Sequence, residues 1–181
     1  NDDKTKYLNF TIIDNTTAQK DYLYGGEFYD NRGNSFSGYN KENANVPVLH
    51  KHALVNITIK VSSTIADLFT INELTLTNTN HAGTIEVEYD KTDGLVEGVT
   101  CTAATGDDAK VVDHEFSSLK TTVPTVTPLS ESYLVFPAGQ TSIYINYSMT
   151  GVVNPIETTL TLNGNWESGK HYVYNLTLTT S

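Results

Sequence analysis

The stretch that decides the fold lies near the end of the chain and reads Trp166-Glu-Ser-Gly-Lys-His-Tyr-Val-Tyr-Asn-Leu-Thr-Leu178. A turn around Gly169 leads into a segment whose even-numbered positions are apolar and whose odd-numbered positions are mostly polar. This period of two residues is typical of a strand with one face on a core and the other in water. We therefore predict a strand over residues 170–179. The residues expected to face inward are Tyr172, Tyr174 and Leu176.

The same alternation recurs along the chain. It is strongest over residues 52–61, where Ala53, Val55, Ile57, Ile59 and Val61 share one face. Further strands are predicted at 6–13, 73–78, 84–89, 132–136, 142–149 and 157–162. The core residues expected from them are Leu8, Phe10, Ile12, Ile85, Val87, Tyr89, Ile143, Ile145, Tyr147 and Met149.

One segment is apolar without alternation. Tyr133-Leu-Val-Phe136 is a continuous apolar run before Pro137, which predicts a central strand buried on both faces. Turns rich in Gly, Asn, Asp and Pro separate the predicted strands. About seven short strands of this kind predict an all-β fold, a two-layer antiparallel β-sandwich. The composition agrees, because the chain is rich in the β-branched and aromatic residues that strands favour.

The stretch from Gly25 to Pro47 breaks this pattern. Its many Gly, Asn and Ser residues favour turns, and its apolar residues do not alternate. We expect an irregular connection, more mobile than the sandwich, in which Arg32 is open to an arginine-specific protease. The length of 181 residues allows one domain, or one domain plus part of another. The Gly-rich stretch is the best candidate for a boundary, so we divide the chain into residues 1–45, which end in this connecting loop, and residues 46–181, the sandwich domain.

Charge and cysteine content exclude several classes of protein. The formal net charge of −10 disfavours nucleic-acid binding, because an acidic surface repels the phosphate backbone. No apolar run approaches the roughly 18 residues of a membrane-spanning helix. The single cysteine, Cys101, cannot form an internal disulfide, so packing alone must hold the fold.

Two histidines form the best candidate for a metal site. His50 and His52 would lie on the same face of a strand, as zinc ligands can. No third ligand stands at a recognisable spacing, so we expect no metal and no cofactor, and we expect His52 to form a hydrogen bond near the edge of the sandwich. The acidic segments Asp90-Lys-Thr-Asp-Gly94 and Asp107-Asp108 lack the regular ladder of a calcium loop and are predicted to be solvated turns.

Catalytic motifs are missing from the sequence. There is no G-x-S-x-G nucleophile elbow and no glycine-rich phosphate loop, and Cys101 has no neighbouring histidine. We therefore predict a protein that is not an enzyme, and we name no catalytic residue. Four tyrosines in or beside the Gly-rich stretch leave an alternative function open, a carbohydrate-binding surface module. They are Tyr22, Tyr24, Tyr29 and Tyr39.

Three segments resemble the fimbrillin-like proteins of Bacteroides and its relatives. The first is Val46 to Val61, in which His52-Ala-Leu54 matches the family's H-A-L, although His50 stands where an aromatic residue is usual. The second is Tyr133-Leu-Val-Phe-Pro137 followed by Ile143-Tyr-Ile-Asn-Tyr147, and the third is the stretch from Trp166 to Leu178. Upstream, the segment from Phe10 to Tyr24 is similar to the last part of the preceding domain of that family.

The resemblance implies a transthyretin-like sandwich in a pilus subunit or adhesin, exported to the cell surface, the outer membrane or the fimbrium. It also implies partners, namely other pilus subunits that add a β-strand at an open sheet edge; it identifies no receptor. No lipid-attachment cysteine lies near Asn1, so we expect the export signal and any lipid anchor to belong to the precursor. The chain stops at Ser181, without the extra residues of a strand-donating stalk subunit. We therefore expect either a shortened chain or a tip or accessory subunit.

Overall fold

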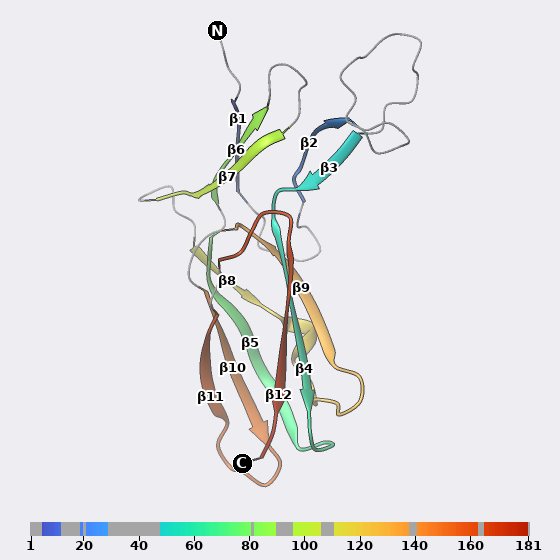
Figure 1. The fold of residues 1–181 in the computed structure, drawn as a ribbon. Coiled ribbons are helices and arrows are strands. Elements are labelled where there is room, and N and C mark those ends of the chain that lie inside the picture. The colour runs from blue at the N-terminus through green and yellow to red at the C-terminus, as the bar shows by residue number, and fades with distance from the viewer. Residues whose placement is uncertain are drawn as a thin grey trace.

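The computed structural model describes residues 5–11, 19, 21–28, 48–80, 82–89, 96–105, 111–137, 141–162 and 165–180. These residues form strands almost throughout, with one short 3-10 turn, η2, at Ser117–Leu119 (Figure 1). The strands are β1 (Thr5–Thr11), β2 (Leu23–Phe28), β3 (Val48–His52), β4 (Val55–Ser63), β5 (Phe69–Asn80), β6 (Ala82–Tyr89), β7 (Val96–Ala103), β8 (Val111–Glu115), β9 (Leu129–Val135), β10 (Thr141–Met149), β11 (Ile156–Leu162) and β12 (His171–Leu178).

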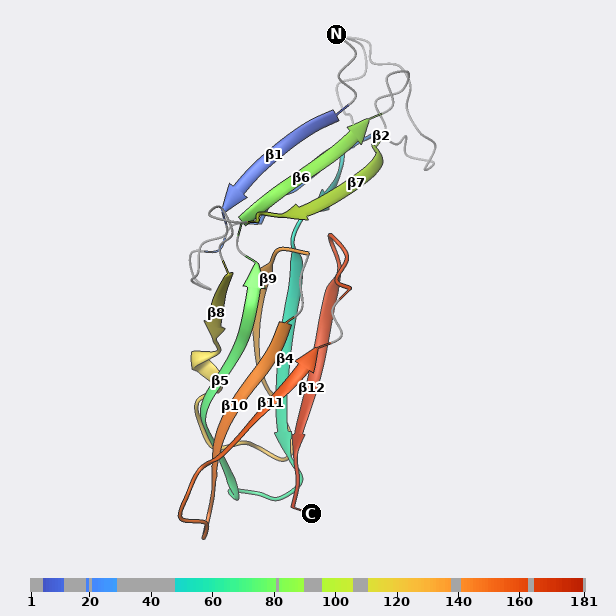
Figure 2. The same cartoon turned by 90° about the vertical axis from the view of Figure 1, so that its left-hand side faces the viewer.

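Seven of these strands form a sandwich of two sheets, in the lower part of Figure 1. One sheet has the strand order β11-β10-β5-β8 and the other has the order β12-β4-β9. In the view of Figure 2, β8 and β9 lie toward one side of the sandwich, and β11 and β12 lie toward the other. The predicted all-β sandwich is confirmed, as is its size of about seven strands. The strands that form the sandwich differ from those predicted, because β8 was not predicted and residues 84–89 belong to another sheet.

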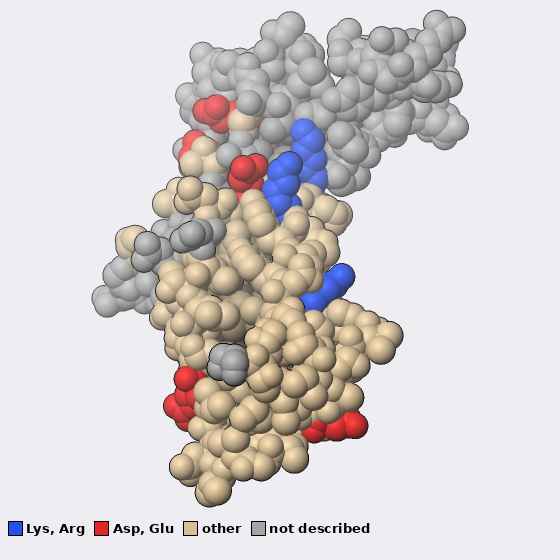
Figure 3. Space-filling model, turned by 60° about the horizontal axis from the view of Figure 1, so that its bottom comes forward, with Lys and Arg blue, Asp and Glu red and all other residues tan. Residues whose placement is uncertain are grey.

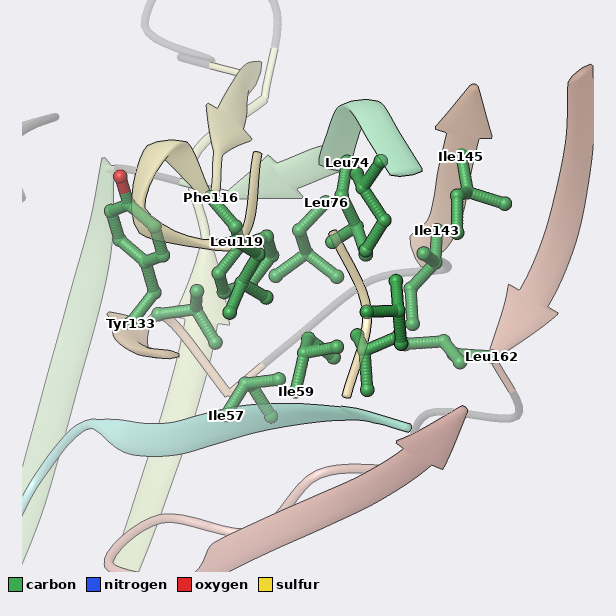
Figure 4. Close-up of a cluster of buried hydrophobic side chains, with 14 of the residues drawn as sticks. Ile57, Ile59, Leu74, Leu76, Phe116, Leu119, Tyr133, Ile143, Ile145 and Leu162 are labelled. Carbon is green, nitrogen blue, oxygen red and sulfur yellow. The ribbon is translucent and has the colours of Figure 1, made fainter. Parts of the chain in front are cut away.

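Alternation along the strands builds the core of the sandwich. Inward side chains from three strands meet in one cluster (Figure 4): Ile57 and Ile59 of β4, Leu74 and Leu76 of β5, and Ile143 and Ile145 of β10. All of them are at most 2% exposed. Burial of each such side chain contributes roughly 1.5–3 kcal/mol, so the cluster is a major source of stability. The inward faces predicted for residues 52–61 and 142–149 are confirmed.

Two features of the sheet β12-β4-β9 differ from the sequence prediction. The strand β9, which contains most of the apolar run Tyr133–Phe136, lies at the edge of the described sheet, and β4 lies at its centre. The apolar run extends to Phe136 because this side chain packs against Gly83 of β6, where a Cβ would lie 2.5 Å from the phenyl ring. In addition, β12 runs parallel to β4, whereas all other described strand pairs are antiparallel.

Two smaller sheets lie above the sandwich in Figure 1, and we call them the upper sheets. One has the order β1-β6-β7, and the other pairs β2 with β3. Strand β2 includes Gly25–Phe28, so the predicted irregular connection is wrong for this part. Pairing with β3 fixes the segment despite its missing alternation, with a register shift between Gly25 and Glu27. Residues 29–47, including Arg32, lie outside the described residues.

The larger upper sheet joins distant parts of the chain. Strand β1 pairs with β6 from Thr5 opposite Glu88 to Thr11 opposite Ala82. Ile85 and Val87 of β6 are buried, as predicted for residues facing inward, but they belong to this sheet and not to the sandwich. A division of the chain at residues 45 and 46 stays a prediction.

Candidate functional site

Gly169 determines where β12 begins. Its φ is +74°, and a Cβ there would lie 2.8 Å from the carbonyl oxygen of His52, so glycine alone fits without strain. The Gly169 amide donates to the carbonyl of Leu54 (3.1 Å), and Ser168 Oγ donates to the carbonyl of Ala53 (2.8 Å). These contacts hold the upper end of β12 beside β4.

Two tyrosines of β12 stabilise the same corner. Trp166 Nε1 donates to the hydroxyl of Tyr174 (2.8 Å), and the amide of Glu167 donates to the hydroxyl of Tyr172 (3.1 Å). Trp166 itself is buried and packs in the sandwich core. The spacing of the aromatic residues in the deciding stretch therefore has a structural reason, because the strand bonds back to the turn that precedes it.

The side of the sandwich where β8 adjoins β9 is covered by the chain, and we call it the closed side. The segment that follows β8 buries Phe116, Leu119 and Val123, each at most 1% exposed. Its backbone bonds to the neighbouring strand β5, for example from the amide of Val123 to the carbonyl of Phe69 (2.9 Å). Water is thereby kept from the core along this side.

Side chains complete the closed side. The hydroxyl of Tyr133 donates to the carbonyl of Glu115 (3.0 Å), which links β9 to the end of β8. Gln19 pairs with the outer edge of β9, because its Nε2 donates to the carbonyl of Leu134 (3.0 Å) and its Oε1 accepts from the amide of Leu134 (2.8 Å). An amide side chain thus occupies the place that a neighbouring strand's backbone would take.

A surface ion pair also lies on the closed side. Lys120 Nζ lies 2.7 Å from Glu115 Oε1, and this hydrogen bond raises the pKa of Lys120 above its usual value. Both side chains are more than two-fifths exposed, so solvent screens the pair and it adds little to stability.

The side of the sandwich that ends in β11 on one sheet and β12 on the other is incompletely covered by the described residues, and we call it the open side. The core-facing side chains of β12 are only half-buried along the whole strand, although those of the neighbouring strand β4 are fully buried. On β11, Leu160 lies opposite Ile143 on the core face and yet is 41% exposed. The apolar side chains that line the open side are Ile156, Leu160, Tyr172, Tyr174, Leu176 and Leu178. The inward direction predicted for β12 is confirmed, with partial instead of full burial.

The outer edge of β12 presents a row of backbone groups. The amide of Asn56 donates to the carbonyl of Lys170 (3.0 Å), and the amide of Thr64 donates to the carbonyl of Leu178 (3.1 Å). The even-numbered residues of β12 therefore point their backbone groups at β4. Backbone groups of successive strand residues point to opposite sides. The odd-numbered residues from His171 to Thr177 thus direct N–H and C=O away from β4, where the described residues supply no neighbouring strand.

Strand β12 lacks the residue types with which proteins commonly block a sheet edge. It contains no proline, no lysine and no acidic residue. Much of the sandwich surface also carries no charge in the view of Figure 3. An unblocked edge above an incompletely covered core is suited to receive a further strand, which is the arrangement used in β-augmentation.

The histidines considered from the sequence as a metal site lie on β3 and not on β12. His52, at the end of β3, contacts the carboxylate of Asp21 through Nδ1, as we expected of a histidine that supports the fold. His50 also lies on β3, but its side chain is outside the described part of the molecule. Among the described residues, no three His, Cys, Asp or Glu side chains are placed to hold a metal ion.

The remaining candidates are only partly described. Cys101 lies on β7 and Tyr24 on β2, with side chains outside the described part, and Tyr22 is half-buried. Outside the described residues lie 90–94, 107–108, Tyr29 and Tyr39. Within the described ranges, no helix is long and apolar enough to cross a membrane.

Comparison with known proteins decides the family. The sequence profile of the fimbrillin-like family matches residues 2–181. The chain belongs to the fimbrillin-like family. Among solved structures, this fimbrillin-like chain is similar to a candidate cell adhesion protein from Bacteroides uniformis, with a TM-score of 0.55 and 14% sequence identity over 98% of this chain and 62% of that one. A search of curated proteins gave no match.

A second similar structure is a candidate cell adhesion protein from Bacteroides ovatus, with a TM-score of 0.40 and 18% identity over 71% of this chain and 41% of that one. The fimbrillin-like chain therefore spans less than two thirds of the length of either protein. At such low identity the Bacteroides uniformis protein shows the shared fold alone. The resemblance found in the three sequence segments is confirmed by the family match.

Proposed function

We propose that this fimbrillin-like chain is a non-enzymatic fimbrial subunit or adhesin, exported to the cell surface, which assembles by receiving a β-strand at the open side of its sandwich. Membership of the family supports the pilus or adhesion role. One observation carries the assembly step: the core-facing row of β12 is half-buried beneath an edge with no described neighbour. The partner is a strand of another pilus subunit.

A strand added beside β12 gains two kinds of interaction. Its backbone pairs with the odd-numbered residues of β12, from His171 to Thr177, and this pairing provides affinity without regard to side chains. Its alternate side chains enter between β11 and β12, where they cover groups such as Leu160 and Leu176. Each apolar side chain that becomes fully buried contributes roughly 1.5–3 kcal/mol. The expected partner therefore has an apolar residue at every second position.

The net negative charge of the chain favours assembly at one specific edge over random association. With a formal net charge of −10, free subunits repel one another at long range. Repulsion of this kind opposes random association, while β12 itself carries no acidic residue that would repel an incoming strand. Specific strand addition is therefore favoured over aggregation.

The test is the binding of a peptide that copies the C-terminal strand of a stalk subunit from the same family. We expect tight binding and a raised melting temperature, because the peptide binds only the folded chain. The variant Asn175→Pro should lose this binding, since proline removes an N–H from the middle of the outer edge and leaves the pairing with β4 in place. The matched control Asn175→Thr keeps the N–H and should bind like the unaltered chain.

Two results would overturn the assembly step. One is the absence of peptide binding, together with strictly monomeric behaviour of the unaltered chain at high concentration. The other is equal binding by Asn175→Pro and Asn175→Thr. A thermal unfolding curve of each free variant shows whether it is folded, and a cooperative transition is expected for both, because proline is tolerated on the outer edge of a sheet.

A further inference from the structure

Three loops form the end of the sandwich that lies away from the upper sheets (Figure 1). We call this surface the lower end. Its loops are residues 64–68 between β4 and β5, residues 124–128 before β9, and residues 150–155 between β10 and β11.

Hydrogen bonds tie these loops to one another. The amide of Ser63 donates to the carbonyl of Pro124 (2.9 Å), which joins the first loop to the second. The amide of Thr150 donates to the carbonyl of Leu68 (2.9 Å), which joins the third loop to the first. The lower end is therefore one connected surface that is ordered before a partner arrives, and this lowers the entropic cost of binding.

The lower end combines exposed aliphatic side chains with very little charge. Among the described residues, seven large hydrophobic side chains are exposed, and four of them lie in these loops. They are Ile65 and Val152, each 41% exposed, Val126, which is 89% exposed, and Val153, which is 95% exposed. Asp67 is the only charged residue of the three loops, although 18% of the whole chain is charged. Figure 3 turns this end toward the viewer, and most of the surface in view carries no charge. Depletion of charged residues is typical of the central part of a protein–protein interface.

The lower end adjoins the open side. The carbonyl of Leu178, the last residue of β12, accepts from the amide of Thr64 (3.1 Å), so the first loop is joined to one border of the open side. The third loop continues directly into Ile156, the first residue of β11, at the other border. Apolar surface therefore continues from the open side onto the loops.

A strand added at the open side constrains the position of the subunit that donates it. Such a strand runs beside the eight residues of β12, and its chain leaves at one of the two ends of the sandwich. At the upper end, the turn at Gly169 bonds to the carbonyl of Leu54, and the upper sheets lie above this corner (Figure 1). No described strand lies beyond the lower end. The folded body of the donating subunit therefore has space beyond the lower end.

We propose that the lower end is a docking surface for the folded body of the subunit that donates the strand. The face that fits it is uncharged and aliphatic, because such a face covers Val126 and Val153 without burying an unpaired charge. This inference rests on the proposed function and adds a second contact to it. Two linked contacts bind more tightly than one, because the inserted strand holds the donating subunit next to the lower end.

The test compares two ligands on the full chain by surface plasmon resonance. One is the strand peptide, and the other is the whole stalk subunit from which the peptide is copied. We expect the whole subunit to bind at least about tenfold more tightly than the peptide.

Two variants of the full chain, Val126→Glu and Val153→Glu, place a carboxylate on the lower end. Both side chains already lie in water, so each variant should fold normally, which a cooperative unfolding transition checks. Each should weaken binding of the whole subunit at least about tenfold, because the carboxylate loses water without gaining a partner. Binding of the peptide should be unchanged, because the peptide contacts only the open side.

The matched control is Leu23→Glu. Leu23 lies on β2 in the upper sheets and is 52% exposed, so this variant adds the same charge at the opposite end of the molecule. It should bind both ligands like the unaltered chain. An equal loss of binding in Leu23→Glu would show that net charge alone weakens binding, and it would overturn the inference.

Three other results would overturn the inference while the proposed function stands. The whole subunit binds no more tightly than the peptide, both variants at the lower end bind it normally, or these variants lose the peptide equally. Failure of both ligands to bind the unaltered chain would overturn the proposed function and this inference with it.

The free chain tests two other occupants of the lower end. One is a second copy of the chain, detected as dimers at high concentration by analytical ultracentrifugation. The other is a lipid surface, detected as binding to phosphatidylcholine vesicles. We expect neither. Either association, if Val126→Glu and Val153→Glu abolish it, would assign the lower end to that occupant and overturn the inference.

Discussion

The two sides of the sandwich share a core but differ in how the chain covers it. On the closed side, Phe116, Leu119 and Val123 seal the space between β8 and β9, and Gln19 occupies the outer edge of β9. On the open side, β11 and β12 leave Leu160 and the inward row of β12 partly in water. The two sides therefore differ in how much apolar surface they leave to water, and the proposed strand addition rests on this difference.

The largest effect is expected from removing equal side chains on the two sides. Leu119→Ala on the closed side should lower the free energy of unfolding by about 3–5 kcal/mol, because a fully buried leucine leaves a cavity. Leu176→Ala on the open side should lower it by only about 1–2 kcal/mol, because the side chain is already half in water. Urea unfolding of both variants measures the difference, and equal losses would contradict the contrast between the sides.

A second prediction concerns the contacts that hold the start of β12 at the open side. Gly169→Ala should cost about 2–4 kcal/mol, because alanine at this positive φ is strained and its Cβ would meet the carbonyl of His52. The control Gly151→Ala has a φ of +86° but nothing within 4 Å of the added Cβ. It should cost only about 1–2 kcal/mol, the strain of the backbone alone. A loss at Gly169 no greater than that at Gly151 would show that the corner is not tightly packed.

A third prediction concerns the hydroxyl that ties β12 to its turn. Tyr174→Phe should cost about 1–2 kcal/mol, because the buried indole N–H of Trp166 loses its acceptor. Tyr144→Phe on the outer face of β10 is the control and should change stability by less than about 0.5 kcal/mol. Thermal unfolding compares the two. Equal effects would mean that the Trp166–Tyr174 bond does not anchor the strand.

The smallest effect is expected at the edge of the closed side. Gln19→Ala removes two hydrogen bonds to Leu134 and should cost about 1 kcal/mol, since water replaces the lost partner. Hydrogen exchange at the amide of Leu134 should become faster. Gln19→Glu keeps the size and one acceptor and serves as the control with a partial effect. Unchanged exchange in Gln19→Ala would show that this edge is protected by something else.

The alternation of apolar and polar residues predicted several strands and the faces that they turn toward the core. Alternation identified β4, β10 and β12 and the faces they turn inward, because a strand with one buried face needs every second residue apolar. It missed β2 in the Gly-rich stretch and the parallel pairing of β12 with β4. Both depend on partners far away in the sequence, and pairing of that kind leaves no local signal.

The family resemblance predicted that the candidate site is an open sheet edge, but no sequence pattern indicated which strand forms that edge. Strand β9 shows why: its sequence indicated a central strand, although it lies at an edge that Gln19 covers. Partial burial of Leu176 and exposure of Leu160 reveal the open side, and burial depends on how whole sheets pack.

The most direct measurement is backbone-amide hydrogen exchange along β12, with and without the strand peptide. In the free chain, we expect slow exchange at Tyr172, Tyr174 and Leu176, whose amides face β4, and fast exchange at Val173 and Asn175, whose amides face outward. Binding of the peptide should slow exchange at the outward amides alone. If Val173 and Asn175 already exchange slowly in the free chain, or if bound peptide leaves them fast, the outer edge of β12 is not the acceptor and the open side does not serve assembly.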